Sequence, residues 1–163
     1  MAIKPTTKET VIMKNVPFSE IKRLKSFCKD QTSDPAWRDV LQCLLNDEQD
    51  FEVNNVRFID SDVILSVMAD EIFSDDYTLG CFNAEFIADN SSLNYELVKA
   101  CQQADAYSAI GQALNDTLDE DQKEAFCEAY ASADGYGHHF NRYDFSEAEF
   151  SFNGKTYHVF DNR

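Results

Sequence analysis

Residues 147–160, EAEFSFNGKTYHVF, alternate polar and apolar side chains on both sides of the pair Asn153-Gly154. An Asn-Gly pair between two alternating segments is typical of a tight β-hairpin, because both residues accept a positive φ. The pattern predicts strands on both sides of the turn. The register that follows places Phe150 opposite Tyr157 and Glu149 opposite His158.

A second hairpin is predicted at residues 51–58, FEVNNVRF, where the alternation is interrupted by Asn54-Asn55. Asparagine also tolerates positive φ, so this pair can form the turn. The predicted register sets Val53 opposite Val56 and Glu52 opposite Arg57.

The remaining segments have apolar residues at helical spacing. The sequence predicts helices over residues 20–29, 34–46 (capped by Asp34), 62–72 (capped by Asp60 or Ser61), 78–88, 91–102 (capped by Ser91 or Ser92), 105–115 and 119–132. Residues 1–16 read as a flexible N-terminal arm. We therefore expect an α+β fold in which several short helices pack with two β-hairpins, as a single domain over residues 17–163.

Composition indicates a folded chain, because 44% of the 163 residues are hydrophobic and 13% are aromatic. Acidic disordered chains lack such residues. No apolar run reaches the length of a signal sequence core or of a membrane span of about 20 residues. The five cysteines have no close pair and lie in apolar helical contexts, which predicts reduced core thiols and a cytoplasmic location.

Negative charge is concentrated in the middle of the sequence. Residues 46–135 hold 21 Asp or Glu against Arg57, Lys99 and Lys123, while the whole chain has a net charge of −16. Such a field repels nucleic acid and membrane surfaces and attracts basic proteins. A net charge above about 8 in magnitude also exceeds what solubility requires, although solubility alone remains the simplest explanation.

Residues with catalytic chemistry are few. His138 and His139 lie near Asp144 beside two glycines, which suggests an acid/base or metal cluster, but a surface role is the simpler reading. The sequence has no zinc-ligand spacing, phosphate loop or nucleophile elbow. The acidic pairs at residues 60–62 and 119–121 lack the rest of a calcium loop and fit helix caps better. We expect no catalysis, no cofactor and no bound metal.

The segment 82–102 has the outline of a helix-turn-helix, with its turn near residues 90–92. A DNA-reading version needs basic or amide side chains on the second helix. This helix lies in the most acidic part of the chain, where electrostatics oppose DNA binding. A protein-binding adaptor or regulator built on this segment is the alternative function.

The favoured hypothesis is that the chain imitates DNA. Duplex DNA carries one charge per about 1.7 Å of axis, so 18 charges correspond to roughly 30 Å of duplex. Carboxylates on such a surface would bind a basic nucleic-acid-binding protein, with no direct nucleic acid or membrane contact. The candidate acidic face consists of Asp62, Asp70, Glu71, Asp75, Asp76, Asp116, Asp119, Glu120, Asp121, Glu124 and Glu128.

Residues 66–69, Ser-Val-Met-Ala, with Glu71 after them and Asp62 and Ile64 before them, resemble a helix of the bacteriophage anti-restriction DNA mimics. The resemblance covers about one helix, and the two hairpins and the basic N-terminal region depart from that all-helical family. It implies a phage or mobile-element protein that occupies the DNA channel of a host defence complex, of restriction or CRISPR type, in the bacterial cytoplasm. The target, the oligomeric state, a second contact by the N-terminal region and the role of the two histidines stay open.

Overall fold

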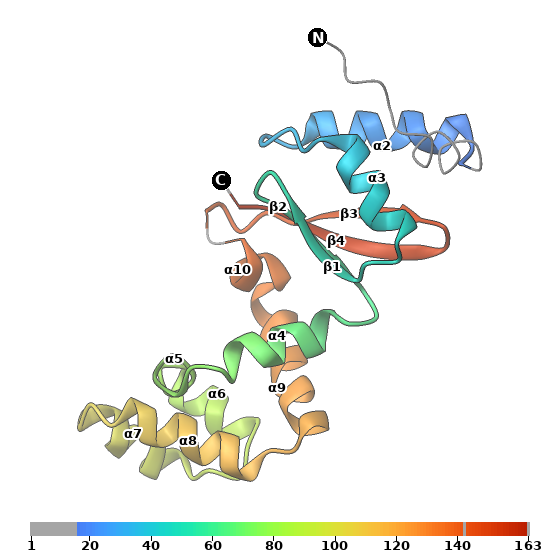
Figure 1. The fold of residues 1–163 in the computed structure, drawn as a ribbon. Helices are drawn as coiled ribbons and strands as arrows, with labels where there is room; N and C mark the ends of the chain where they lie inside the picture. The colour runs from blue at the N-terminus through green and yellow to red at the C-terminus, as the bar shows by residue number, and fades with distance from the viewer. Residues whose placement is uncertain (1–15, 142, 163) are drawn as a thin grey trace. The chain divides into compact units, whose positions relative to one another are not determined.

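The computed structural model describes residues 16–141 and 143–162 (Figure 1). Helices and antiparallel strands occur together, so the predicted α+β class is confirmed. The described chain divides into two compact units. Unit 1 takes in the described residues up to Ser61 and from Ser146 onward, and unit 2 takes in Asp62–Phe145. The predicted arm lies outside the described residues except for Val16, which packs against the core of unit 1.

Unit 1 contains a four-stranded antiparallel sheet of order β1-β2-β4-β3. Its strands are β1 (Asp50–Val53), β2 (Val56–Asp60), β3 (Ala148–Phe152) and β4 (Lys155–Asp161). Both predicted hairpins and their registers are confirmed. The four turn residues have positive φ, between 50° and 82°, as the turn chemistry requires: Asn54, Asn55, Asn153 and Gly154.

The two hairpins join through β2 and β4, where Phe58 lies opposite Val159. Two helices, α2 (Phe18–Asp30) and α3 (Trp37–Leu45), cover one face of this sheet (Figure 1). Leu24 and Leu41 from these helices are buried in one cluster with Phe58 and Tyr157 from the sheet. Burial of these apolar side chains holds the helices on the strands.

The predicted helix caps at Asp34 and at Asp60 or Ser61 are wrong, and α4 begins after Val63 without a side-chain cap. Helix α3 begins after Ala36 without a side-chain cap. Asp60 is the last residue of β2, is 1% exposed, and its Oδ2 lies 3.2 Å from the Lys155 ammonium. A buried carboxylate requires such a partner. Because Lys155 is the first residue of β4, this ion pair joins Asp60 to the sheet rather than to the next helix.

Unit 2 is helical over its described residues. Its elements are α4 (Ile64–Ile72), α5 (Asp76–Gly80), α6 (Ala84–Asp89), α7 (Tyr95–Gln103), α8 (Tyr107–Thr117), α9 (Glu120–Asp134) and α10 (Tyr136–Phe140). Helix α4 packs on α9, and α5 packs closely on α8. Phe126 of α9 lies at the centre, in edge contact with Phe73, Phe82 and Phe86.

Three helix predictions in unit 2 are corrected. The helix expected over residues 78–88 is two helices, because the Asn83 side chain accepts the backbone N–H groups that start α6. Helix α7 is capped by Asn94 rather than by Ser91 or Ser92. The segment after Gly135, where the sequence analysis predicts no helix, contains the short helix α10.

Candidate protein-binding surface

All eleven predicted acidic residues lie in unit 2. Nine are exposed, whereas Asp76 and Glu124 are half-buried. The sequence of unit 2 has 17 Asp or Glu against three Lys or Arg, a net charge of −14, and the sequence of unit 1 has a net charge of only −2. The acidity of the chain therefore belongs almost entirely to the helical unit.

Three of the predicted acids hold helix ends in place. Asp75 caps α5, accepting hydrogen bonds from the Tyr77 backbone N–H (3.0 Å) and the Thr78 hydroxyl (2.6 Å). The Thr78 hydroxyl bond is the main cause that lowers the pKa of Asp75. Asp76 accepts a hydrogen bond from Asn115 Nδ2 at 2.8 Å.

Asp119 forms a capping box with Gln122, so the capping role predicted for this acidic pair is confirmed. Glu120 pairs with the Lys123 ammonium at 2.9 Å. That ammonium also lies over the Phe73 ring, 5.6 Å from its centroid. The capping box and the ion pair therefore stabilise the first turn of α9 itself, and the Lys123 cation–π contact connects this turn to Phe73 at the end of α4.

Five other predicted acids have no hydrogen-bond or ion-pair partner among residues 16–141 and 143–162: Asp70, Asp116, Asp121, Glu124 and Glu128. Three of these acids lie on α9 at positions i, i+3 and i+7, namely Asp121, Glu124 and Glu128. This spacing puts them on one side of the helix over an axial distance of about 10 Å. They are the carboxylates best placed to contact a partner.

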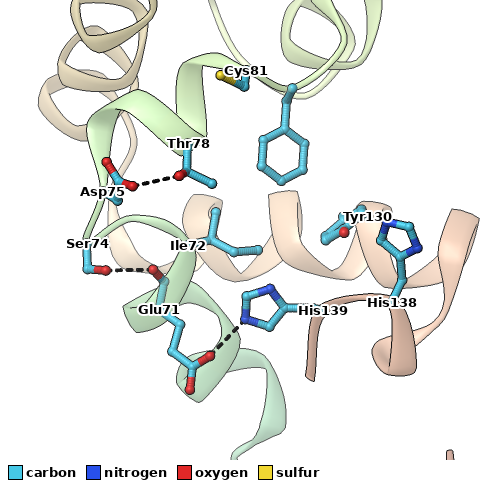
Figure 2. Close-up of a pocket in the computed structure, with 10 residues that line it drawn as sticks. Glu71, Ile72, Ser74, Asp75, Thr78, Cys81, Tyr130, His138 and His139 are labelled. Carbon is cyan, nitrogen blue, oxygen red and sulfur yellow. Dashed lines mark hydrogen bonds and ion pairs between the residues drawn. The ribbon is translucent and has the colours of Figure 1, made fainter. Parts of the chain in front are cut away.

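An open pocket of about 490 Å³ lies within unit 2 (Figure 2). Carboxylates contribute to one part of its wall and aromatic rings to another. The side chains that line it include Glu71, Asp75, Phe82, Tyr130, His138 and His139. Burial is the main cause that raises the pKa of Tyr130, so its hydroxyl stays protonated at neutral pH.

The two histidines face different partners in this pocket. His139 Nε2 lies 2.9 Å from Glu71 Oε2 (Figure 2). His138 stacks on Phe145 with ring centroids 4.9 Å apart and meets Tyr130 edge-on at 5.9 Å. Both histidines line the pocket because α10 folds back on α9.

Asp144, which the sequence grouped with the histidines, is not among the pocket residues and accepts a hydrogen bond from Asn141 at 2.8 Å. The sequence analysis missed the pocket and its pairing of Glu71 with His139. These two residues are 68 positions apart, and no local pattern connects them.

The helix-turn-helix-like segment consists of α6 and α7 with a turn between them. The described residues on α7 include one basic side chain, Lys99, whose ammonium lies 5.4 Å from the centroid of the Tyr95 ring. Leu97 is 58% exposed on the same helix. The surface of α7 is therefore partly apolar and offers one cation.

No helix within the described part of the chain is both long enough and apolar enough to span a membrane. Comparison with known protein families, curated proteins and solved structures finds nothing that matches this chain.

Proposed function

We propose that this protein acts without catalysis as an acidic inhibitor, and that unit 2 occupies the nucleic-acid-binding groove of a basic protein of a bacterial defence system. The observation that carries this proposal is the net charge of −14 on unit 2, with most of its carboxylates exposed. At one charge per about 1.7 Å of duplex axis, 14 charges correspond to roughly 24 Å of DNA. The resemblance of residues 62–71 to anti-restriction mimics supports the same class of target.

The mechanism is competitive. Partner Lys and Arg side chains that normally hold phosphates pair instead with carboxylates such as Asp121, Glu124 and Glu128. The capping box at Asp119 and the Asn115 bond to Asp76 fix the backbone that carries these groups. A fixed acidic surface avoids the ordering cost that a flexible acidic tail incurs on binding.

The pocket of unit 2 supplies a specific anchor for one cationic side chain of the partner. A guanidinium can form charge-assisted hydrogen bonds with a carboxylate while its plane stacks on an aromatic ring. Glu71 and Asp75 offer the carboxylates, and Phe82 and Tyr130 offer the rings. Arginine in such a pocket is a common hot spot of protein interfaces.

The test captures partners from lysates of bacteria that carry defence systems, using the full chain and two variants. In the first variant, Asp70, Asp116, Asp121 and Glu128 are changed to Asn or Gln. The control removes the same charge from exposed acids of unit 1, namely Asp30, Asp39, Glu48 and Glu52. We expect the full chain to capture a nucleic-acid-binding protein, and both duplex DNA and salt should release it. The first variant should no longer capture this protein, whereas the control variant should still capture it.

Equal loss in both variants would show that only net charge matters and would contradict a defined acidic surface. A partner that stays bound in excess duplex DNA would contradict mimicry.

A second candidate function is a protein-binding adaptor that uses α7. The exposed Leu97 and the half-exposed ring of Tyr95 favour it, since both are apolar groups on one short helix. If this function is correct, Leu97→Ser abolishes capture and the fourfold acidic variant does not. The proposed inhibitor requires the opposite result.

A further inference from the structure

Three side chains with metal-binding chemistry meet on the face of the β3–β4 hairpin opposite the one that packs against α2 and α3. Glu149 of β3 lies directly opposite His158 of β4 in the antiparallel register. Glu147 precedes β3 by one residue, two positions before Glu149. Alternate residues of an extended strand point to the same side, which brings both carboxylates to the imidazole.

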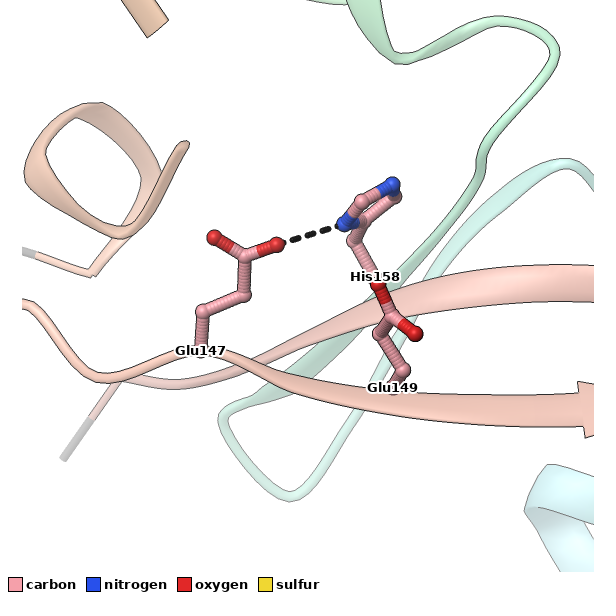
Figure 3. A group of neighbouring side chains, drawn as sticks. All are labelled: Glu147, Glu149 and His158. Carbon is pink, nitrogen blue, oxygen red and sulfur yellow. Dashed lines mark hydrogen bonds and ion pairs between the residues drawn. The ribbon is translucent and has the colours of Figure 1, made fainter. Parts of the chain in front are cut away.

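The distances agree with this placement. One carboxylate oxygen of Glu147, one of Glu149 and one ring nitrogen of His158 all lie within 4.8 Å of one another. His158 Nδ1 is 2.6 Å from Glu147 Oε1, and Figure 3 shows that carboxylate turned toward the ring. Ligand atoms around a tetrahedral zinc ion are about 3.4 Å apart, so small side-chain rotations bring the three atoms to coordinating positions.

Charge also favours a cation here. Neither Glu147 nor Glu149 has a Lys or Arg ion pair within residues 16–141 and 143–162. Two carboxylates side by side repel each other unless a proton or a cation lies between them. His158 Nδ1 and Glu147 Oε1 already lie within hydrogen-bond distance, so the fold itself brings two of the ligand atoms together.

The backbone that carries these ligands is well supported. The strand pair is closed by the Asn153-Gly154 turn, and Phe150 and Tyr157, the next cross-strand pair toward that turn, are buried in the core of unit 1. Ligands on a rigid ladder lose little freedom when they bind an ion. The ligands are exposed or half-buried, so an ion can reach them and can keep coordinated water.

We infer that Glu147, Glu149 and His158 form a binding site for a divalent transition-metal ion of the zinc type. One imidazole nitrogen and two carboxylate oxygens suit zinc and its first-row neighbours better than calcium or magnesium, which prefer oxygen ligands alone. This inference goes beyond the expectation of no bound metal, which nothing in the structure tests, and it does not depend on the function proposed for unit 2. The predicted hairpin register already places Glu149 opposite His158, but the spacing of the three ligands matches no metal motif, so the sequence alone does not indicate a metal site.

The test is a ZnCl₂ titration of the full chain with ¹⁵N-labelled histidine, followed by NMR of the ring nitrogens. This readout is local, so zinc bound to an exposed thiol such as Cys81 does not imitate it. We expect the Nδ1 signal of His158 to shift at about one equivalent of zinc while those of His138 and His139 stay. Glu149→Gln and, separately, Glu147→Gln should weaken the binding at His158 about tenfold or more.

The matched control is Glu52→Gln, which removes the same charge from exposed β1 in the same sheet. It should leave zinc binding at His158 unchanged. The amide signals of Phe150 and Tyr157 report whether each variant keeps the hairpin. The inference is overturned if His158 does not respond to millimolar zinc, or if both glutamine variants bind zinc as tightly as the unmodified chain.

Discussion

Gly111 of α8 lies directly against the backbone of Asp76 in α5. A Cβ on Gly111 would come closer than 3.0 Å to the Asp76 carbonyl group, and a Cβ on Gly80 would meet the Tyr107 backbone in the same way. Two helices approach this closely only where a side chain is absent. The glycine pair therefore decides how α5, which carries Asp76, sits on α8.

The first prediction follows from this contact. Gly111→Ala should lower the free energy of unfolding by at least about 2 kcal/mol, because the backbone clash exceeds the gain of about 1 kcal/mol in helix propensity. Urea unfolding followed by circular dichroism measures the change. The exposed neighbour Gln112 provides the control, and Gln112→Ala should stay within about 0.5 kcal/mol of the unmodified protein. A stable Gly111→Ala protein would show that α5 and α8 are not packed this closely.

The second prediction concerns Asp75, whose pKa is lowered mainly by the Thr78 hydroxyl. A carboxyl group with a lower pKa in the folded state stabilises the protein above its unfolded pKa of about 3.9, and this stabilisation is lost as the pH falls through the folded value. Asp75→Asn keeps a capping oxygen but cannot ionise. The stability difference between the two proteins should be present at pH 7 and should shrink at pH 3.

The measurement for Asp75 is urea unfolding at both pH values. Glu128→Gln serves as the control, because it removes an exposed charge from α9 that has no capping role. If Asp75→Asn shows the same difference at pH 3 as at pH 7, the ionised carboxylate is not the stabilising group.

The third prediction concerns thiol reactivity. Burial raises the pKa of Cys28 and of Cys127 to about 12, so at pH 8 only about one thiol in 10⁴ is ionised at each site. Cys81 is exposed. An aromatic disulfide reagent should therefore react first with Cys81 and reach the two buried thiols only as the protein unfolds.

The readout is absorbance of the released thiolate against time, with and without urea. Cys81→Ser should remove the fastest phase and leave the slow ones. Rapid reaction of Cys127 in the folded protein would contradict its burial. The prediction of core thiols is confirmed for Cys28 and Cys127, but Cys81 is outside the core, because the helix expected to bury it ends at Gly80.

Local contacts explain what the sequence could predict. The registers of both hairpins depend on two adjacent strands and a turn such as Asn153-Gly154, so a short segment contains all the information. The pairing of β2 with β4 is different, since Phe58 and Val159 are about a hundred residues apart. Alternation predicts that a strand exists and leaves its distant neighbour open.

Local sequence patterns also leave the exact helix ends and the roles of the acidic residues open. Ser91, Ser92 and Asn94 are all good caps, but the Ser91 hydroxyl donates to the Ile87 carbonyl of α6, and Asn94 accepts the backbone N–H groups that begin α7. The acidic residues could be found from composition, but composition could not separate Asp75, which holds a helix end, from Asp121 and Glu128, which have no such task. That distinction depends on the folded geometry.

The fourth prediction concerns the pocket of unit 2. N-acetylarginine amide should bind there with a millimolar dissociation constant, seen as shifts in the ring signals of His138 and Tyr130. Glu71→Gln removes one of the two carboxylates in the wall and should weaken binding about tenfold, since a charge-assisted hydrogen bond contributes about 1.5 kcal/mol. His139→Ala removes one hydrogen-bond partner of Glu71 and should leave binding equal or stronger, because this imidazole no longer competes with the guanidinium.

The control for the pocket is Glu96→Gln, which removes the same charge from an exposed position on α7 that does not line the pocket. It should leave the dissociation constant unchanged. Equal weakening by Glu96→Gln and Glu71→Gln would mean that the amide senses only the field of unit 2, and the partner would then be held by distributed charge without an arginine anchor. Selective weakening by Glu71→Gln would instead place one arginine of the partner against Glu71, and a partner that lacks that arginine should bind the full chain about tenfold more weakly.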